Sequence, residues 1–327
     1  MTRELKACAK SWPMIEPFVI ARGTQTTADV VVVEIGDGAF TGRGEAAGVT
    51  YAGETPETML RDIDSARAAI EDGADRDALL GLMAPGGARC AVDAALWDLE
   101  AKQSGTRAWQ RAGVARGEAI TSAITIGIRD LAGYEKAALA LAERPWIKIK
   151  VARNDPLGAV HAVRRAAPDA KLIVDANQAW TVDDLKQLAP ELVALGVDLL
   201  EQPVKVGHDD GLRDYRCPIP VCADESVNTA ADLPGLVGRY AFINIKLEKA
   251  GGLTAGLQLA RAAQAQGFRL MSGCMCGGSL AMAPMMVLGQ LCEINDLDGP
   301  LLQSDDWPGG IVYTRGVMSP PWPAFWG

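Results

Sequence analysis

Histidine is nearly absent from this chain of 327 residues, which contains only His161 and His208. A His-rich metal site or a histidine-based catalytic triad therefore has almost nothing to work with. The seven cysteines are odd in number and scattered along the chain, so buried reduced thiols are a simpler expectation than a disulfide framework. The close pair in Cys274-Met275-Cys276 has no nearby partners with which to form a zinc site.

Long apolar runs and blocks of basic residues are also missing. No apolar stretch approaches the ~20 residues needed to span a bilayer, and the first ten residues carry charges throughout. The net charge is -9, and Lys and Arg form no cluster, which argues against nucleic acid or an anionic membrane as partner. We therefore expect a cytoplasmic protein that has neither of these partners and binds cations or small zwitterions.

The first third of the chain has the pattern of a small α+β domain. The run of four valines at 30–33, the turn Gly36-Asp37-Gly38 and a return segment to residue 46 predict a β-hairpin. A helix is expected to begin after the N-cap Thr55, with a buried stripe at Met59, Ile63, Ala66 and Ile70. A second helix is expected through 91–99, ending at Gly105. A meander followed by helices predicts an α+β domain over residues 1–117.

From about residue 118 onward, short apolar strands alternate with helical patterns. The expected strands lie near 121–127, 146–151, 171–175, 198–202, 219–223, 241–246, 269–273 and 292–296. Repeated βα units favour a closed parallel barrel over an open sheet, because an open sheet of eight strands needs a reversal of strand order that nothing here indicates. The fold class is therefore α/β, with a TIM-like barrel whose sites form at the carboxyl ends of the strands.

Three acidic residues, Asp175, Glu201 and Asp224, end successive predicted strands. In a barrel their carboxylates converge on one mouth as hard oxygen ligands, for which Mg²⁺ is the natural occupant. A single acid at a strand end is more often a helix cap or a loop anchor. Three in register favour a metal site.

Lysines accompany these acids. Lys148 and Lys150 lie two apart on one strand, so both point into the barrel, where neighbouring ammonium groups lower each other's pKa and allow one to act as a base. A pair that extends to solvent is the alternative. Lys246 ends another strand and faces the pair across the barrel. Opposed bases suit removal of a proton α to a carboxylate on one face and its return on the other, with a metal stabilising the charge that develops.

Five segments together resemble the muconate-lactonizing subgroup of the enolase superfamily, in order and over nearly the whole chain: Lys148-Ile149-Lys150, Asp175-Ala176-Asn177, Glu201-Gln202-Pro203, Ala223-Asp224-Glu225-Ser226 and Asn244-Ile245-Lys246. The resemblance implies a (β/α)7β barrel over 118–304 under an N-terminal α+β capping domain, which residues from about 305 to 327 complete. It assigns Asp175, Glu201 and Asp224 to Mg²⁺. It makes Lys150 and Lys246 the acid/base pair, supported by Lys148, which also binds the substrate carboxylate. Because barrels of this kind commonly associate, we expect a homo-oligomer.

Two further segments bear on the substrate. Asp296-Leu297-Asp298 resembles the Asp-x-Asp of dipeptide epimerases, in which Asp296 and Asp298 would hold the α-ammonium of a dipeptide; an Asp-rich turn is the alternative. The segment 17–23 is similar to the capping loop of L-Ala-D/L-Glu epimerases, in which Arg22 would pair with the side-chain carboxylate of the terminal Glu. A surface arginine is the competing account. Gly277 departs from the family pattern, which often has an acid there, and this bears on the substrate range.

The sequence thus predicts an isomerase, a Mg²⁺-dependent dipeptide epimerase that interconverts L-Ala-L-Glu and L-Ala-D-Glu by two-base proton transfer in murein peptide metabolism. One alternative on the same fold is a muconate cycloisomerase or an o-succinylbenzoate synthase, a lyase that needs one base and no ammonium pocket. Another is a non-catalytic, metal-stabilised scaffold, for which replacing Lys150 or Lys246 would change nothing measurable.

Overall fold

A three-stranded antiparallel sheet, in the order β1-β2-β3, forms the N-terminal part of the computed structural model, which describes residues 3–20 and 23–327. The strands are β1 (Glu4–Ile20), β2 (Gly23–Asp37) and β3 (Phe40–Ala47). The β2–β3 pair confirms the predicted hairpin. Strand β1 was not predicted; it pairs with β2 and has an irregularity between Pro13 and Phe18. Arg22 lies outside the described residues.

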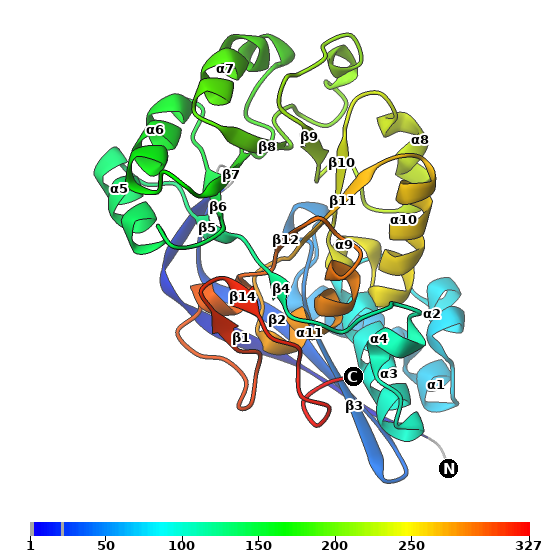
Figure 1. Cartoon of the computed structure of the whole chain (residues 1–327). Helices are drawn as coiled ribbons and strands as arrows, with labels where there is room; N and C mark the ends of the chain where they lie inside the picture. The colour runs from blue at the N-terminus through cyan, green and yellow to red at the C-terminus, as the bar shows by residue number, and fades with distance from the viewer. Residues whose placement is uncertain (1–2, 21–22) are drawn as a thin grey trace.

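Helices cover this sheet (Figure 1). They are α1 (Pro56–Glu71), α2 (Arg76–Leu82), α3 (Gly87–Ser104) and α4 (Ala108–Arg111), preceded by the 3-10 turn η1 (Thr50–Ala52). The buried residues of α1 are those of the predicted stripe, and its N-cap is Thr55. Helix α3 packs so closely on β3 that a Cβ at Gly44 would lie 2.1 Å from the carbonyl oxygen of Ala91. It ends at Gly105, whose φ of 65° is left-handed.

Eight parallel strands form the predicted barrel, in sequential order from β5 to β12 (Figure 1). They are β5 (Ile124–Ile126), β6 (Trp146–Lys150), β7 (Lys171–Asp175), β8 (Val197–Glu201), β9 (Val221–Ala223), β10 (Phe242–Ile245), β11 (Arg269–Gly273) and β12 (Ile294–Asp296). Between the first and last strands, the backbone N–H of Ala123 donates to the carbonyl of Asn295 at 2.7 Å. The structure therefore confirms a nearly closed TIM-like barrel.

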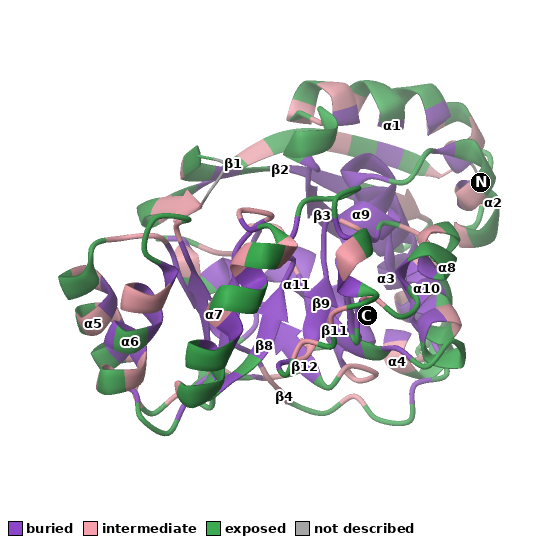
Figure 2. Cartoon of the chain, turned by 90° about the horizontal axis from the view of Figure 1, so that it is seen from above, coloured by how far each residue is buried: buried purple, intermediate pink, exposed green. Residues whose placement is uncertain are grey.

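Helices connect the strands and lie outside the ring. They are α5 (Leu131–Ala140), α6 (Pro156–Ala166), α7 (Val182–Ala194), α8 (Leu233–Leu236), α9 (Leu247–Ala250), α10 (Leu253–Ala265) and α11 (Ser279–Gly289). Those such as α5, α6 and α7 have exposed outer faces, whereas α9 and α11 are buried throughout (Figure 2). Single 3-10 turns occur at η2 (Asp210–Leu212), η3 (Ala230–Asp232) and η4 (Gly299–Leu302). Within the described chain, η2 is the one helical turn between β8 and β9.

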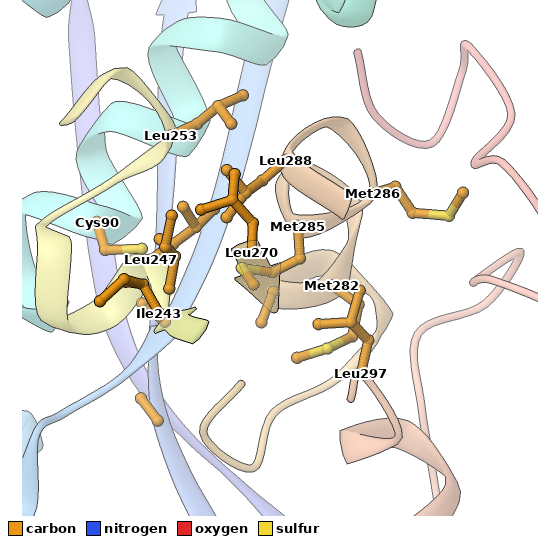
Figure 3. Packing of buried hydrophobic residues seen from close by; sticks show 14 of the residues in the cluster. Cys90, Ile243, Leu247, Leu253, Leu270, Met282, Met285, Met286, Leu288 and Leu297 are labelled. Atoms are coloured by element: carbon orange, nitrogen blue, oxygen red, sulfur yellow. The ribbon is translucent and has the colours of Figure 1, made fainter. Parts of the chain in front are cut away.

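The core has two parts. One continuous cluster runs between the barrel and its helices and through the N-terminal sheet and α3; Figure 3 shows Cys90 of α3 near Leu247 of α9. A separate cluster fills the inside of the barrel, and its members are Ala123, Ile173, Leu199, Cys222, Phe242, Met271 and Ile294. We call these seven side chains the apolar floor of the barrel. Polar side chains can pack directly above them.

The last part of the chain returns to the N-terminal units. Strand β13 (Tyr313–Thr314) pairs with β14 (Val317–Met318), which in turn pairs with β4 (Ile120–Thr121). Beyond them, Arg43 donates to the carbonyl of Phe325 at 2.7 Å, and the Trp326 indole donates to the carbonyl of Ala94 at 3.2 Å. The domain boundaries at 117/118 and 304/305 stay a prediction. Among the described residues, no helix is long and apolar enough to cross a membrane.

Candidate functional site

A polar layer stands directly above the apolar floor of the barrel. In a strand, residues two apart point to the same side, so the residue two positions after each floor residue also faces the interior. The floor-to-site pairs are Ala123 and Thr125, Ile173 and Asp175, Leu199 and Glu201, Cys222 and Asp224, Phe242 and Asn244, and Ile294 and Asp296. The strand period thus brings the sequence-predicted acids together at the carboxyl end of the barrel.

The three predicted metal ligands are almost fully buried, with 0% exposure for Asp175 and Glu201 and 2% for Asp224. Lys148 reaches between two of them, its Nζ lying 3.2 Å from Asp175 Oδ2 and 2.7 Å from Glu201 Oε2. The same ammonium lies 2.7 Å from Asp296 Oδ2. Carboxylates from β7, β8 and β12 therefore surround one buried cation of the protein itself.

Lys150 and Lys246 contact opposite ends of the row of acids. Lys150 Nζ lies 2.6 Å from Asp175 Oδ2, and Lys246 Nζ lies 2.9 Å from Asp224 Oδ2. Lys150 ends β6 and Lys246 follows β10, with β7, β8 and β9 between them in the barrel. Both lysines are buried at the mouth, so neither turns out to bulk water.

The charges of the site differ from the sequence-based expectation that the paired lysines lower each other's pKa. Burial lowers the pKa of Lys148, but Asp296, Glu201 and Asp175 outweigh it and hold that pKa well above its usual value. Burial likewise opposes Asp224 at Lys246, whose pKa is also raised. For Lys148 the expectation does not hold, because it left out the carboxylates around this lysine.

The pKa values of the acids are shifted in different directions. Burial and the neighbouring Asp175 carboxylate raise the pKa of Glu201 to about 7. Burial also raises the pKa of Asp175, but Lys150 and Lys148 outweigh it and bring that pKa to about 2. Of the three predicted metal ligands, Glu201 is thus the one whose negative charge the protein compensates least.

The predicted Asp296 and Asp298 lie on one side of the mouth, both buried. Thr125 joins them: its hydroxyl lies 3.3 Å from Asp296 Oδ1, and its backbone N–H donates to Asp298 Oδ2 at 2.6 Å. Burial and the adjacent Asp296 carboxylate raise the pKa of Asp298 to about 7. The structure therefore brings together every predicted site residue that it describes, and Arg22 lies outside its described ranges.

Two family models match this architecture. Residues 2–113 match "Mandelate racemase / muconate lactonizing enzyme, N-terminal domain", and residues 134–318 match "Enolase C-terminal domain-like". The chain belongs to the enolase superfamily. This confirms the resemblance that the five segments carry.

Among relatives in the superfamily, the L-Ala-D/L-Glu epimerase of Escherichia coli is 38% identical over 97% of this chain and 99% of its own. The N-acetyl-D-glutamate racemase of a Pseudoalteromonas species is 40% identical over 91% and 95%. A crystal structure of an enolase family member from Agrobacterium tumefaciens, described as homologous to dipeptide epimerases and as holding sodium and L-Ala-L-Glu, is 41% identical. It has a TM-score of 0.97 and covers 99% of this chain and 100% of that one.

The acids of this enolase-superfamily chain suit a divalent cation by their chemistry. Asp175, Glu201 and Asp224 supply hard oxygen donors from three adjacent strands. Oε2 of Glu201 lies 2.7 Å from Lys148 Nζ but accepts no hydrogen bond of good geometry, so this buried oxygen has room for a further ligand contact. Within the ranges 3–20 and 23–327, no three acidic, His or Cys side chains form a preassembled metal cluster. The ammonium of Lys148 stands between two of the acids, Asp175 and Glu201.

Gln202 holds Asp224 in place, and sequence reasoning did not assign it a role. It has 0% exposure and a left-handed φ of 34°, which is costly for a residue with a side chain. Its Oε1 accepts the backbone N–H groups of Asp224 at 2.8 Å and Ser226 at 3.1 Å. The loop that carries Asp224 is therefore fixed by the residue that follows Glu201.

Sequence reasoning also missed Asn244 and Lys249. The amide of Asn244 donates to Glu201 Oε1 at 2.9 Å, and Lys249 Nζ lies 2.7 Å from Asp224 Oδ1. The period-two rule applied to Phe242 points to Asn244, so that residue could have been found. Lys249 lies in α9 beyond the strand, and only the three-dimensional path of that helix brings it to Asp224.

Proposed function

We propose that the chain is a Mg²⁺-dependent dipeptide epimerase that inverts the α-carbon of the C-terminal residue, interconverting L-Ala-L-Glu and L-Ala-D-Glu. One observation carries this proposal. Two buried lysines, Lys150 and Lys246, flank a row of carboxylates from opposite sides of the barrel. A molecule bound through its carboxylate above that row presents its two faces to two different amines.

The relatives support the same reaction class. The Escherichia coli protein is an L-Ala-D/L-Glu epimerase, and the Agrobacterium tumefaciens structure is described with sodium and L-Ala-L-Glu. Together with the three hard oxygen donors, the cation in that structure supports Mg²⁺ at Asp175, Glu201 and Asp224 here. When bound, the cation stabilises the second negative charge on the substrate carboxylate and, by like-charge repulsion, favours neutral lysine amines.

The chain's own residues then replace the α-proton by another proton on the opposite face. The neutral amine of one lysine, Lys150 or Lys246, takes the α-proton and becomes an ammonium. The other lysine, protonated, gives a proton to the opposite face and becomes neutral. Lys148, buried and positively charged, orients the substrate carboxylate. Running the steps in reverse converts the other antipode, so each lysine serves as base for one configuration.

Asp296 and Asp298 supply the pocket for the α-ammonium of the dipeptide. Asp296 carries negative charge beside Lys148, and both acids lie at the end of β12 next to Thr125. A free ammonium would bring the positive charge that favours the ionised form of Asp298. A peptide with an amino group therefore fits better than a molecule without one.

An N-acylglutamate racemase is a second candidate, because the Pseudoalteromonas relative carries that activity at 40% identity. It needs the same lysines but no ammonium pocket. Exchange of the α-proton into deuterated water, measured by mass spectrometry with N-acetyl-L-Glu and with L-Ala-L-Glu, separates the two. Faster exchange on N-acetyl-L-Glu would refute the dipeptide assignment.

The proposal predicts that Lys150→Ala and Lys246→Ala each abolish epimerisation. Each variant can at most exchange the α-proton of one antipode with solvent, without inverting that antipode. This is the antipode whose α-proton faces the remaining lysine, so it differs between the two variants. The matched control is Lys136→Ala on the exposed face of α5. Exchange is followed by proton NMR on both antipodes, with circular dichroism as a check of folding.

A non-catalytic scaffold would leave exchange by the two variants at the wild-type level. A cycloisomerase or an o-succinylbenzoate synthase would turn over its own substrates and leave both dipeptides unchanged. Location in the cytoplasm, a homo-oligomer, the absence of nucleic acid and membrane partners, and a role in murein peptide metabolism complete the proposal. Contact of Arg22 with the substrate's side chain is part of it too.

A further inference from the structure

The connection between β8 and β9 contains a buried acid, Asp209. It is 2% exposed, although the residues on either side of it are exposed. Its Oδ1 lies 3.0 Å from Arg239 Nη1, and its Oδ2 accepts the hydroxyl of Tyr240 at 2.7 Å. Both partners lie just before β10. One carboxylate therefore ties the β8–β9 connection to the segment that leads into β10.

The hydroxyl of Tyr240 has a fixed direction. A carboxylate can only accept a hydrogen bond, so Tyr240 uses its one proton as the donor to Asp209. Burial raises the pKa of Tyr240 above its usual value and the Asp209 carboxylate adds to that effect, so the hydroxyl keeps this proton. The Tyr240 oxygen is then an acceptor, and Gln202 Nε2 donates to it at 3.0 Å.

This direction decides which way the amide of Gln202 points. An amide has an NH₂ donor group on one side and an oxygen acceptor on the other. The NH₂ group faces Tyr240 and the Ser226 hydroxyl oxygen, which lies 2.9 Å away. The amide oxygen therefore faces the backbone N–H groups of Asp224 and Ser226, from which it accepts. A reversed amide would set its NH₂ group against these two donors.

The result is a continuous hydrogen-bonded path from the surface to a predicted metal ligand. At its outer end Arg239 pairs with Asp209 and with the exposed Asp210. From Asp209 the path runs through the hydroxyl of Tyr240, which is 5% exposed as a residue, to the amide of Gln202. It ends at the backbone of Asp224.

We infer that Tyr240 and Asp209 are positioning residues that set the Mg²⁺ affinity of the site, acting through Gln202 on Asp224. This inference rests on the proposed function, in which Asp224 is a ligand of Mg²⁺. Hydrogen bonds behind a metal ligand hold it in place, and their loss commonly weakens metal binding by about 10- to 100-fold. Tyr240 acts one hydrogen bond further from the ligand than Gln202, so we expect a smaller effect.

The test is titration of the full chain with Mg²⁺ by isothermal titration calorimetry. Tyr240→Phe keeps the aromatic ring and removes only the hydroxyl, so the NH₂ group of Gln202 loses an acceptor and the amide is free to turn. We expect the Mg²⁺ affinity to fall about three- to tenfold. Tyr215→Phe, which removes a hydroxyl from the connection that carries Asp209, is the matched control and leaves the affinity unchanged.

Asp209 gives a second arm. Asp209→Asn places an amide beside Tyr240 that is able to donate to its oxygen, so the direction of the tyrosine hydroxyl is no longer fixed. We expect a similar fall in Mg²⁺ affinity. Asp210→Asn, at an exposed acid that pairs with the same arginine, is the control and leaves the affinity unchanged. This arm keeps the test valid if Tyr240→Phe does not fold, since it leaves the tyrosine in place.

A double variant separates positioning from a general loss of structure. Because Tyr240 acts through Gln202, adding Tyr240→Phe to Gln202→Ala leaves the Mg²⁺ affinity within about twofold of that of Gln202→Ala alone. A general structural role would instead lower the affinity by the same factor in both backgrounds. Urea unfolding of each variant confirms that the protein titrated is folded.

Two outcomes overturn the inference. One is a Mg²⁺ affinity that stays within about twofold of the wild-type value in both Tyr240→Phe and Asp209→Asn. The other is an effect of Tyr240→Phe that is equally large with and without Gln202, which means that the tyrosine acts by a different route.

Exchange of the α-proton of L-Ala-L-Glu distinguishes a failure of the proposed function. Weaker Mg²⁺ binding in Tyr240→Phe, together with a wild type that exchanges no α-proton, refutes the epimerase reaction and supports the inference. Exchange by the wild type, together with equal Mg²⁺ affinities in the wild type and Tyr240→Phe, supports the epimerase and refutes the inference. A wild type that binds no Mg²⁺ refutes the metal assignment and the inference with it.

Discussion

Asp93 in α3 gives a sharp test of the burial argument, because no lysine or arginine side chain forms an ion pair with its carboxylate in the described part of the chain. Its carboxylate is 1% exposed, Oδ2 accepts the backbone N–H of Thr254 at 3.1 Å, and Oδ1 has no hydrogen-bond partner among the described residues. Burial raises its pKa from 3.8 to about 6. The folded protein therefore binds a proton at Asp93 more tightly than the unfolded chain does.

The sign of the effect follows from proton linkage. Below about pH 4, the pKa of Asp93 in the unfolded chain, the Asp93 carboxyl is protonated in both the folded and the unfolded protein, and its contribution to stability is fully present. Between about pH 4 and pH 6 the unfolded chain loses this proton while the folded protein still holds it. The free energy of unfolding therefore falls as the pH rises through this window. A difference of about two pKa units corresponds to about 3 kcal/mol. Asp93→Asn removes this loss, because its side chain does not titrate.

The assay is urea unfolding of the wild type and of Asp93→Asn between pH 4 and pH 7. Other buried acids also titrate in this range, so the measured quantity is the difference between the two proteins at each pH. That difference is expected to shift by about 3 kcal/mol across the window, in favour of the variant at high pH. Asp62→Asn, on an exposed face of α1, is the control. A difference that stays constant with pH would refute the reasoning.

Two further predictions concern packing and the site. Gly44→Val places a Cβ 2.1 Å from the carbonyl oxygen of Ala91 and lowers the melting temperature by about 5 °C or more. The control is Gly81→Ala in helix α2, where an added Cβ meets nothing within 4 Å; it leaves the melting temperature unchanged or raises it slightly. An unchanged melting temperature for Gly44→Val would contradict the close packing of α3 on β3. Gln202→Ala frees the loop that carries Asp224 and weakens Mg²⁺ binding about 10- to 100-fold, as measured by isothermal titration calorimetry. An unaltered Mg²⁺ affinity would show that Gln202 does not position Asp224.

Much of the barrel and its acids could be predicted because both follow simple periods. Each βα unit repeats a strand, and residues two apart share a face, so Asp175 and Glu201 had to meet over the floor formed by Ile173 and Leu199. The comparisons confirm the family and the fold that this pattern indicated.

The parts that could not be predicted depend on distant segments. Strand β1 is mostly exposed, so it lacks the apolar alternation that would mark it, and only its pairing with β2 defines it. The high pKa of Lys148 comes from Asp296, 148 residues further along the chain. Cys276 acquires its contact with Gln25 in the same way, across 251 residues. Such pairings follow from the tertiary fold and leave no local pattern.

Glu45 has a consequence for how the molecule matures. Its carboxylate accepts the indole N–H of Trp12 at 3.1 Å, the indole N–H of Trp307 and the backbone N–H of Gly278. Trp12 belongs to the N-terminal sheet, but the other two donors lie 233 and 262 residues beyond Glu45, so this carboxylate stays partly unpaired until both have docked. The loop after β11, which carries Gly278, is anchored to β3 only when Gly278 has docked on Glu45. A well-formed entrance to the barrel therefore requires segments far apart in the sequence to fold together.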